Sequence, residues 1–406
     1  MMEAFRVHIA FYSPEWPPAK AANGIVTYVA AMRDYLLAQG HEVSVLTLGR
    51  MIDSTGRDQD MGIGQDGRGI VGRARRFLER HRGDLPCLGR ALGKQFQALH
   101  RLAPLDLIEM EESFGWSEIV RRTSQVPVVT RLHGPFFLKP DEQRSNREVR
   151  ADSQRRKAEG IAIVGATSLT APTMATLERT CLHYGRSLSK QAAAIPNPIA
   201  MANDSWRLDA CDRNHILMVG RFDHPKGADT ILLAFNQLIE RRPAARLTLV
   251  GPDMGMQMAS GAMLSFGDYV ATHLSPLARR QVRFTGRLSP SAITRLRREA
   301  LVTAQCSRLE NFPYTLTEGL SAGCPMISTD WAGAEEIIAH GENGLLTPVG
   351  DPDAMAANLE WMLDHPEEIA AMGDRAQAHC RAHFSTGAVG SRMVDWYRTT
   401  IAESRR

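Results

Sequence analysis

The chain has 406 residues, a length that favours two or more domains. With 44% hydrophobic and 23% charged residues, its composition is that of an ordinary soluble globular protein. The net charge of +3 is too small in magnitude to indicate nucleic-acid binding, so we expect no nucleic-acid partner. No uninterrupted apolar run is long enough to span a bilayer.

The six cysteines are widely scattered and form no C-x-x-C pair. This pattern argues against a disulfide framework and a zinc site, and for reduced thiols in a cytosolic compartment. The first apolar run, Val7–Tyr12, is too short for a signal peptide. We therefore expect a cytoplasmic protein.

The N-terminal segment predicts a parallel sheet. A strand over Arg6–Tyr12 leads through Gly24 into a helix over 25–39, and the next strand covers Glu42–Leu48. This is a βαβ unit, whose strands are parallel. A glycine after the first strand lets the backbone approach a ligand closely, although the G-x-G-x-x-G fingerprint of dinucleotide-binding folds is absent.

The rest of the first half continues the alternation of strands and helices. Residues 51–67 predict a long exposed loop, and the strand Pro127–Leu132 ends at His133-Gly134. Pro196-Asn197-Pro198 is a rigid turn and the best domain boundary. The other expected elements are strands Asp106–Met110, Ala166–Ala171 and Ala192–Ile195, and helices 141–160 and Thr173–His183.

The second half repeats this alternation, and from residue 353 the chain is almost entirely helical. We predict an N-terminal domain over 1–195, onto which a helix of about 386–406 packs back, and a C-terminal domain over 196–385. Two Rossmann-like α/β domains with parallel sheets suggest a ligand cleft between two rows of strand ends. The predicted strands are His215–Val219, Arg246–Val250, Val282–Thr285, Leu301–Gln305, Pro325–Ser328 and Gly344–Thr347.

The stretch from Glu310 to Pro325 predicts a strand end, a loop and a helix over 313–322. A helix that starts at the carboxyl end of a parallel strand offers N–H groups and a positive dipole end to a phosphate. The carboxylates of Glu310 and Glu318 would repel a bare phosphate, so they fit hydroxyls that flank one. The alternative is a capping box, Thr315-x-x-Glu318, with Glu310 as a solvated loop residue.

A second anion site is predicted after the strand Leu217–Val219. Gly220-Arg221 precedes Lys226-Gly227, and an arginine and a lysine five residues apart can clamp a pyrophosphate from two sides. The alternative is a commonplace surface lysine before a turn glycine.

Glu-x7-Glu, followed by Gly-Leu-Ser-Ala-Gly-Cys-Pro and preceded by Gly-Arg…Lys-Gly, resembles the signature of retaining glycosyltransferases of family four, the glycosyl transferases group 1. The resemblance implies the two-domain GT-B fold. It also implies that Glu310 holds donor-sugar hydroxyls, that Glu318 holds the ribose, and that Arg221 and Lys226 contact the donor diphosphate.

By the same resemblance, the catalytic residues would be Glu310, His133, Arg221 and Lys226, without a metal. Two departures from the family pattern stand out. Asn23 replaces the first of two common glycines, and asparagine is the mildest replacement because it is able to adopt positive φ. Asn311-Phe312-Pro313-Tyr314 replaces the common Phe-Gly. The implied residues of the donor and nucleotide site are Asn23, Gly24, Gly220, Arg287, Leu288, Asn311, Phe312, Tyr314, Thr315, Leu316 and Glu318.

The resemblance implies a retaining, metal-independent transferase that moves a sugar from a nucleotide diphosphate sugar to a sugar or lipid-linked acceptor. We expect surface polysaccharide or glycolipid assembly, and same-face attack, because no motif places a carboxylate nucleophile. Three alternatives stay open: a sugar-nucleotide 2-epimerase, a phosphorylase, and a non-catalytic binding subunit with the GT-B fold.

Three further features leave alternatives open. The acidic residues Glu109, Glu111 and Glu112 follow a strand and are either acceptor-side groups or ordinary loop carboxylates. Asp351-Pro352-Asp353 resembles a metal-binding D-x-D but fits a helix cap better. The arginine-rich stretch 68–82 is either a solvated face or an amphipathic helix that docks on an anionic membrane surface, at the inner face of the membrane.

Overall fold

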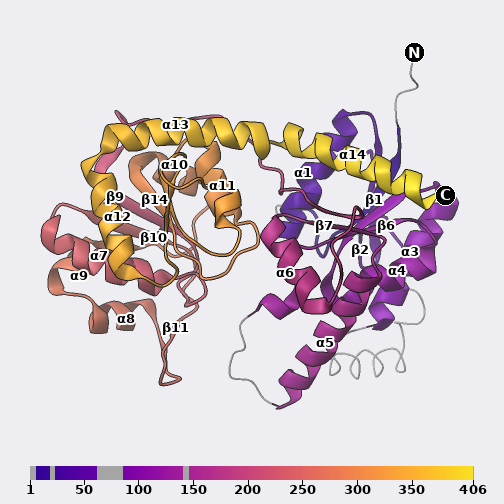
Figure 1. The fold of residues 1–406 in the computed structure, drawn as a ribbon, viewed down its shortest axis with the longest axis horizontal. Coiled ribbons are helices and arrows are strands. Elements are labelled where there is room, and N and C mark those ends of the chain that lie inside the picture. Colours follow the sequence, from indigo (N-terminus) through magenta and orange to yellow (C-terminus); the bar gives the residue numbers. More distant parts are fainter. Residues whose placement is uncertain (1–5, 19–22, 62–85, 140–145, 406) are drawn as a thin grey trace. The chain divides into compact units, whose positions relative to one another are not determined.

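The computed structural model describes residues 6–18, 23–61, 86–139 and 146–405. The chain forms two compact units: unit 1 comprises residues 1–198 and 386–406, and unit 2 comprises residues 199–385. Each unit is an α/β layer structure with its own largely parallel sheet, seen as two separate groups of strands in Figure 1. The sequence-based boundary lies after residue 195, and the units divide after Pro198.

Unit 1 contains an eight-stranded sheet in the order β4-β3-β2-β1-β5-β6-β7-β8. The strands from β2 to β8 across the sheet are parallel, with Ile9 level with both Val43 and Leu107. Most of them are buried on both faces, which is why they read as near-continuous apolar runs in the sequence. The parallel strands are β1 (His8–Tyr12), β2 (Glu42–Thr47), β5 (Leu107–Glu111), β6 (Val128–Arg131), β7 (Ser168–Ala171) and β8 (Ala192–Ala194).

The exposed loop predicted for residues 51–67 is wrong over its first part. Strands β3 (Arg50–Ile52) and β4 (Asp58–Asp60) add an antiparallel edge to the sheet, with Val45 opposite Ile52. Three-residue strands with polar residues carry almost no period-2 signal, so only pairing with β2 reveals them. Residues 62–67 and the arginine-rich stretch 68–82 lie outside the described residues.

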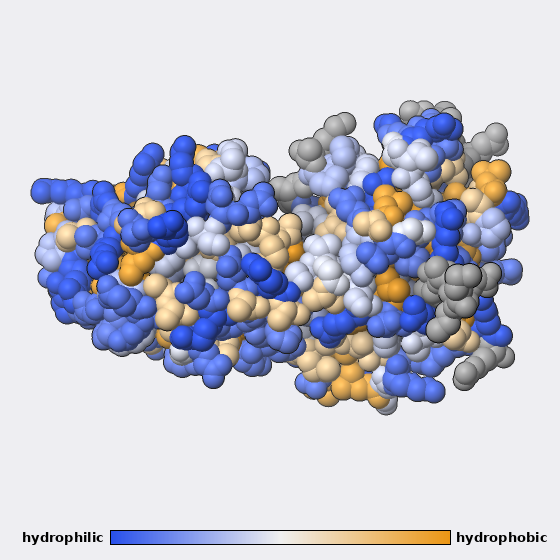
Figure 2. All heavy atoms as spheres, turned by 90° about the horizontal axis from the view of Figure 1, so that it is seen from above, coloured by the Kyte–Doolittle hydropathy of each residue, from blue (hydrophilic) through white to orange (hydrophobic). Residues whose placement is uncertain are grey.

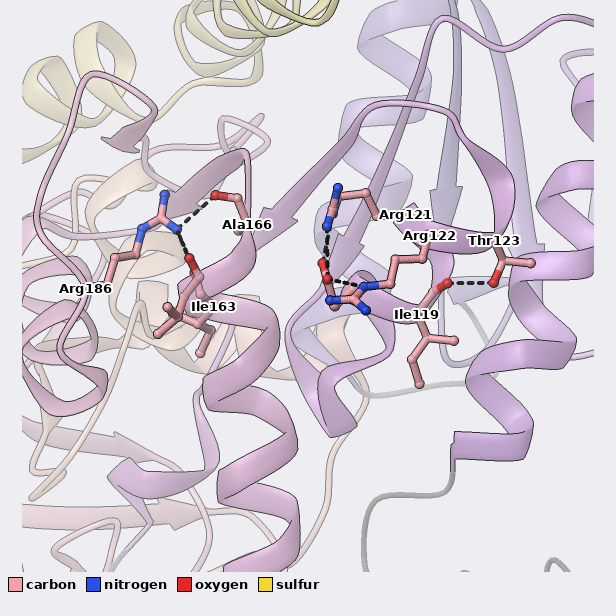
Figure 3. Close-up of polar contacts among 9 residues, drawn as sticks. Ile119, Arg121, Arg122, Thr123, Ile163, Ala166 and Arg186 are labelled. Carbon is pink, nitrogen blue, oxygen red and sulfur yellow. Dashed lines mark hydrogen bonds and ion pairs between the residues drawn. The ribbon is translucent and has the colours of Figure 1, made fainter.

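The helices of unit 1 cover both faces of its sheet (Figure 1). At the end of α5, Arg186 donates to the carbonyl oxygens of Ile163, Val164 and Ala166 at 2.8–2.9 Å, which satisfies acceptors that a helix end leaves open (Figure 3). The helices are α1 (Gly24–Ala38), α3 (Pro86–Leu102), α4 (Trp116–Ser124), α5 (Asn146–Gly165) and α6 (Met174–Tyr184), with short 3₁₀ turns η3 (Ser113–Gly115) and η4 (Phe136–Leu138).

The last helix, α14 (Thr386–Ser404), completes the core of unit 1. It lies against α1 so closely that a Cβ on Gly390 would stand 2.4 Å from the ring of Tyr35. The periodic spacing of its inward side chains is that of a helix with one buried face. Those buried side chains are Val389, Met393, Tyr397 and Ile401.

A buried arginine ties strand β6 to the end of unit 1. Arg131 is fully buried, and its Nη2 donates to the Ile195 carbonyl at 2.8 Å and to Asn197 Oδ1 at 2.8 Å. Its guanidinium lies 4.2 Å from the centre of the Tyr28 ring in α1. These contacts fix β6 just before His133.

Unit 2 contains a six-stranded parallel sheet in the order β13-β10-β9-β14-β15-β16. Strands β10 and β13 follow β9 on one side of it, and strands β15 and β16 follow β14 on the other side. The strand order therefore reverses between the neighbours β9 and β14. In open α/β sheets, ligands bind at the carboxyl ends of the strands at this reversal. The strands are β9 (Asp212–Val219), β10 (Arg246–Val250), β13 (Val282–Phe284), β14 (Ala300–Gln305), β15 (Met326–Thr329) and β16 (Leu345–Thr347).

The helices of unit 2 begin at residues that the sequence marks. Asp351 accepts hydrogen bonds from the N–H groups of Asp353 and Ala354, so the interpretation of Asp351-Pro352-Asp353 as a cap is confirmed. A two-stranded ribbon, β11 (Met256–Gln257) and β12 (Met263–Leu264), was not predicted. The helices are α7 (Ala228–Arg241), α8 (Phe266–His273), α9 (Pro276–Gln281), α10 (Pro290–Glu299), α11 (Tyr314–Ser321), α12 (Pro352–Asp364) and α13 (Pro366–His383), with a 3₁₀ turn η5 (Ala334–Glu336).

The surface is mostly hydrophilic on the face that Figure 2 shows, with small apolar areas. In unit 1, exposed aliphatic side chains include Ile161 and Val164 at the end of α5 and Leu182 on α6. Within the described ranges, none of the helices combines the length and the apolar character needed to cross a membrane.

Candidate functional site

The loops after β9 and β14 are fastened to each other in unit 2. Arg308, just after β14, donates its backbone N–H to the Pro225 carbonyl at 2.9 Å. Its guanidinium forms a bidentate ion pair with Asp229 in α7, at 2.8 and 2.7 Å, and also donates to the His224 carbonyl at 2.6 Å. A bidentate arginine–carboxylate pair fixes orientation as well as distance, so the segment carrying Lys226 is held against the segment carrying Glu310.

Gly227 makes this contact possible. It has φ +67°, and a Cβ there would stand 1.8 Å from the Cys306 carbonyl oxygen. Only glycine combines the left-handed conformation with so close an approach. The Lys-Gly pair is therefore part of a packed junction between two strand ends, which goes beyond a commonplace surface turn.

Lys226 and Glu310 form an ion pair at this junction. Glu310 Oε1 also accepts from Ser307 Oγ at 2.7 Å and from Gln305 Nε2 at 3.3 Å. Among the described residues, Oε2 accepts no hydrogen bond. The Glu310 side chain is 13% exposed, so the alternative of a solvated loop residue is wrong.

Arg221 lies on the same edge of the sheet, directly after β9. Its Nε is 2.7 Å from Asp223 Oδ2, and its side chain is 48% exposed. The other oxygen of Asp223 accepts the backbone N–H of Lys226 at 2.8 Å. Asp223 thus links the two cations, while Phe222 between them is buried among aromatic rings.

Helix α11 begins at Tyr314, with Pro313 as the N-cap and no side-chain cap. The capping box Thr315-x-x-Glu318 is therefore wrong, because Thr315 already lies inside the helix. A helix start without a side-chain cap directs its N–H groups and the positive end of its dipole outward from the strand end. Phe312 packs on Phe384, and Leu316 is buried, so these two side chains anchor the helix start.

Glu318 is positioned by an arginine from α10. Arg297 Nη1 is 2.8 Å from Glu318 Oε2, and its Nη2 donates to the Thr315 carbonyl at 3.0 Å. Arg297 is buried, whereas the Glu318 side chain is 47% exposed. The carboxylate is thus held at the surface by a buried cation.

The remaining predicted residues of unit 2 lie on the same edge. Gly220 donates its N–H to the Val250 carbonyl at 2.9 Å, which places it between β9 and β10. Arg287 and Leu288 follow β13. Leu288 packs against the small cluster of Leu217, Val250 and Ala300, and Arg287 is exposed. Asn311 is partly buried between Glu310 and Phe312.

In unit 1, His133 follows β6 at the carboxyl edge of the sheet. Its backbone N–H and that of Gly134 donate to Glu112 at 2.9 and 2.8 Å. Its ring packs edge-on against Tyr28 of α1, with 5.1 Å between ring centres. Burial, together with the positive charge of Arg131, lowers the pKa of His133 well below its usual value, so the imidazole is neutral at neutral pH.

Asn23 and Gly24 form the start of α1, one turn before Tyr28. Asn23 does not use the positive φ that its residue type allows: the residue is extended, at φ −135°. Its Oδ1 accepts the Ile25 N–H at 2.9 Å, so asparagine is suited to this position as a helix cap. Gly24 is the first helical residue and is exposed. Asn23, Gly24 and His133 thus gather within unit 1.

The three acidic residues near β5 are all buried and bonded. Glu109 accepts from the Tyr397 hydroxyl at 2.7 Å, and Glu111 accepts from Ser113 at 2.9 Å. Burial raises the pKa of Glu111 to about 7. The interpretation as ordinary loop carboxylates is wrong, because all three are buried and Glu109 and Glu111 lie within β5. A role on the acceptor side stays a prediction.

Sequence reasoning missed the residues that hold the site together: Asp223, Arg297, Ser307 and Arg308. The partners of Arg297 and Arg308 lie 18 to 84 residues away in the chain. Such contacts leave no local pattern. For a metal ion, the described residues contain no group of three or more His, Cys, Asp or Glu side chains. Metal independence stays a prediction.

Two family models match adjacent parts of the chain. Glycosyltransferase Family 4 matches residues 22–202, and Glycosyl transferases group 1 matches residues 204–379. A phosphatidyl-myo-inositol mannosyltransferase from Mycolicibacterium smegmatis is 30% identical over 220 residues, which cover 52% of this chain and 53% of that protein. The chain thus spans about half the length of the curated relatives that it matches at 30% identity.

Solved structures resemble the whole chain. A sucrose-phosphate synthase from Thermosynechococcus elongatus has a TM-score of 0.72 at 22% identity, covering 98% of this chain and 100% of that one. HepE from Anabaena, in complex with UDP and glucose, has a TM-score of 0.66 at 18% identity and covers 97% and 100%. At these identities the likeness shows the fold, and the predicted GT-B fold of two α/β domains with parallel sheets is confirmed.

Proposed function

Because the chain belongs to the glycosyl transferases group 1 and has the GT-B fold, we propose that it transfers a sugar from a nucleotide diphosphate sugar to an acceptor hydroxyl. The transfer retains the configuration of the sugar and needs no metal. The observation that carries this proposal is the Lys226–Glu310 pair at the reversal point of the unit 2 sheet.

The residues around this pair offer positive charge to a diphosphate and a carboxylate to the hydroxyls of a sugar. Lys226 and the exposed Arg221 supply two cations, and the start of α11 adds oriented N–H groups. These groups stabilise the charge that develops on the leaving diphosphate, a role that Mg²⁺ takes in other transferases. When the diphosphate binds Lys226, the lysine exchanges one anion for another, and Glu310 becomes available to sugar hydroxyls.

The outer part of the site recognises the nucleoside. Glu318, held by Arg297, accepts hydrogen bonds from the ribose hydroxyls. Arg287 and Leu288 lie beside the base, and the segment from Asn311 to Leu316 surrounds the phosphates. HepE binds UDP and glucose in its solved complex, which supports a nucleoside diphosphate as the ligand here.

Unit 1 contributes the groups that act on the sugar and the acceptor. The neutral imidazole of His133 serves at the reacting carbon, and the α1 start at Asn23 and Gly24 approaches the β-phosphate. Attack by the acceptor hydroxyl occurs on the same face that the diphosphate leaves, without a covalent intermediate. Isolation of a glycosylated enzyme residue after incubation with donor would contradict this course.

The acceptor is a sugar or a lipid-linked sugar in surface polysaccharide or glycolipid assembly. The mannosyltransferase relative is named for a phosphatidyl-inositol, which supports a lipid-linked acceptor. Docking of the stretch 68–82 on an anionic membrane surface belongs to the same proposal. We expect anionic, but not neutral, vesicles to bind the protein in a salt-sensitive way, and glutamate at positions 75 and 76 to abolish this binding.

The test is calorimetric binding of UDP, GDP, dTDP and ADP without metal, to the wild type and to Lys226→Ala. We expect one nucleotide to bind, with an affinity about tenfold or more lower in the variant, because a charge-assisted contact is lost. Arg246→Ala is the control, since it removes the same charge at the opposite, amino end of β10. Absence of binding to all four nucleotides would contradict the proposal.

A further inference from the structure

The loop that carries His133 is held by carboxylates through its backbone. Glu112 accepts the His133 N–H on Oε2 at 2.9 Å and the Gly134 N–H on Oε1 at 2.8 Å. Its side chain is almost wholly buried at the carboxyl end of β5. One carboxylate thus satisfies two successive backbone donors with its two oxygens.

A second buried carboxylate continues the arrangement. Glu159 of α5 accepts the Phe136 N–H on Oε2 at 2.8 Å, and Arg155 Nε lies 2.8 Å from Oε1. The Arg155 guanidinium also lies 4.4 Å from the centre of the Phe136 ring. Since Pro135 has no N–H, all the backbone N–H groups from His133 to Phe136 donate to Glu112 or Glu159.

We propose that Glu112 is a positioning residue of the transfer reaction, whose ionised carboxylate fixes the His133-Gly134 backbone and thereby the imidazole at the reacting carbon. This inference rests on the proposed function, because it requires His133 to act on the donor sugar. Glu112 acts only through His133 and does not touch the substrate. A displacement of about 1 Å at a reacting group is enough to lower a rate substantially.

No neutral side chain of the same length can accept both backbone N–H groups at once. A glutamine offers one acceptor oxygen, and its NH₂ group would face the second backbone N–H donor. One of the two loop amides would lose its partner inside the protein, which is unfavourable for a buried donor. Only a carboxylate presents two acceptors to two neighbouring N–H groups.

The surroundings of Glu112 raise the pKa of its carboxyl group. Burial, with the negative charges of Glu159 and Glu111, raises the pKa of Glu112 to about 8, although the hydrogen bond from the His133 N–H opposes the shift. As the pH rises through this value, the ionised form that accepts both N–H groups becomes dominant. Among the described residues, the titratable groups that interact with this carboxyl are Glu111, Glu159 and Tyr184, together with His133 through its backbone N–H. Arg155 pairs with Glu159.

The first measurement is amide hydrogen exchange of the peptide containing His133 and Gly134 in Glu112→Gln. At a pH above about 8, where the wild-type carboxyl is mostly ionised, we expect faster exchange of these amides in the variant than in the wild type. The control is Glu118→Gln in α4, which replaces another buried carboxylate of unit 1, one that pairs with Arg121 and Arg122. Glu118 is not bonded to the loop, so its variant keeps the wild-type exchange of these amides.

The second measurement is turnover with the nucleotide sugar whose nucleotide binds. We expect Glu112→Gln to lower kcat by about 10- to 100-fold with KM for the donor within about threefold, because an orientation effect is lost and the binding groups of unit 2 remain. The wild-type kcat rises as the pH passes through about 8, where Glu112 loses its proton, and the variant lacks this rise. Glu112→Asp keeps the charge and both acceptors, so it folds, loses less kcat and retains the rise.

The outcomes separate this inference from the proposed function. No turnover of any nucleotide sugar by the wild type would overturn both. Turnover in the wild type with unchanged kcat and pH profile in Glu112→Gln would overturn the positioning role alone. An equal loss of kcat in Glu118→Gln would do the same, because it would trace the effect to the general stability of unit 1. If Glu112→Gln does not fold, a wild-type kcat in Glu112→Asp would overturn the role.

Discussion

At the scale of single residues, the site depends on charges that already have partners in the free protein. Lys226 is paired with Glu310, Arg221 with Asp223, and Glu318 with Arg297. Such pairs keep each side chain in one orientation before a ligand arrives, which reduces the ordering that binding requires. In the proposed function, an anionic ligand would compete with a carboxylate for Lys226 and for Arg221, and the side chains around them would keep their places.

The raised pKa values of two buried carboxyl groups at the end of β5 make the free energy of unfolding depend on pH. Burial raises the pKa of Glu111 to about 7 and that of Glu112 to about 8, both above the 4.5 of an exposed glutamate. At pH values between 4.5 and these raised pKa values, the folded protein therefore binds more protons than the unfolded chain. We expect the free energy of unfolding to fall by a few kcal/mol as the pH rises from about 4.5 to about 8.

Urea unfolding at pH 5, 6.5 and 8 measures this dependence. The double variant with Gln at positions 111 and 112 lacks both groups, so its stability should change less over the same range. An identical pH dependence in the wild type and the double variant would show that these carboxyls keep their ordinary pKa.

At the scale of elements, the site is a junction of two strand–loop–helix units. The loop between β9 and α7 touches the end of β14, and Arg308 joins them through Pro225 and Asp229. This is why Lys226 and Glu310, 84 residues apart in the chain, lie within contact. The geometry of the site therefore depends on how tightly these loops pack.

Gly227→Ala tests the junction. A Cβ at this position would stand 1.8 Å from the Cys306 carbonyl oxygen at φ +67°, so the loop must move as well as adopt a strained conformation. We expect a loss of about 3 kcal/mol or more in the free energy of unfolding of unit 2, and weaker nucleotide binding. Urea unfolding and calorimetry measure the two effects.

Gly286→Ala is the matched control, since Gly286 has φ +69° but a Cβ added there would meet no heavy atom within 4 Å. It carries the backbone strain alone, which costs about 1 kcal/mol. Equal losses in the two variants would mean that the contact with Cys306 contributes nothing.

At the scale of the whole molecule, the chain leaves unit 1 after Pro198 and returns to it with α14. Four buried side chains of α14 lie in the core of unit 1, and Tyr397 donates to the buried Glu109 at 2.7 Å. Unit 1 is therefore incomplete until the last residues of the chain are in place.

A chain that ends at Ser385 should lose the stability of unit 1 and keep that of unit 2. Burying four large apolar side chains contributes about 6–12 kcal/mol as an upper estimate, comparable to the stability of a domain. Hydrogen exchange should show lost protection in β1 and β5 and retained protection in β9 and β14. Among the contacts of the described residues, a chain that ends at Ser404 loses the exposed Arg405–Asp106 pair, and it should behave as the wild type. Equal protection of unit 1 in both shortened chains would contradict the role of α14.

The sequence by itself determined the parallel strands, most of the helices, the fold and the segments that form the candidate site. Each of these has a local signal: apolar runs for buried strands, proline and glycine for loop ends, and short motifs such as Gly-Arg…Lys-Gly. The predicted donor residues of unit 2, from Gly220 to Glu318, do lie on one edge of a single sheet.

Only the tertiary structure decided what holds those residues in place. The hairpin of β3 and β4 forms because β2 offers an edge, and Asn23 caps α1 although its residue type permitted positive φ. The Arg308–Asp229 pair and the Glu112 contacts with His133 and Gly134 join segments far apart in the chain. A local sequence pattern indicates whether a segment forms a helix, a strand or a loop. A contact between distant segments depends on the packed fold, because no short window of sequence contains both partners.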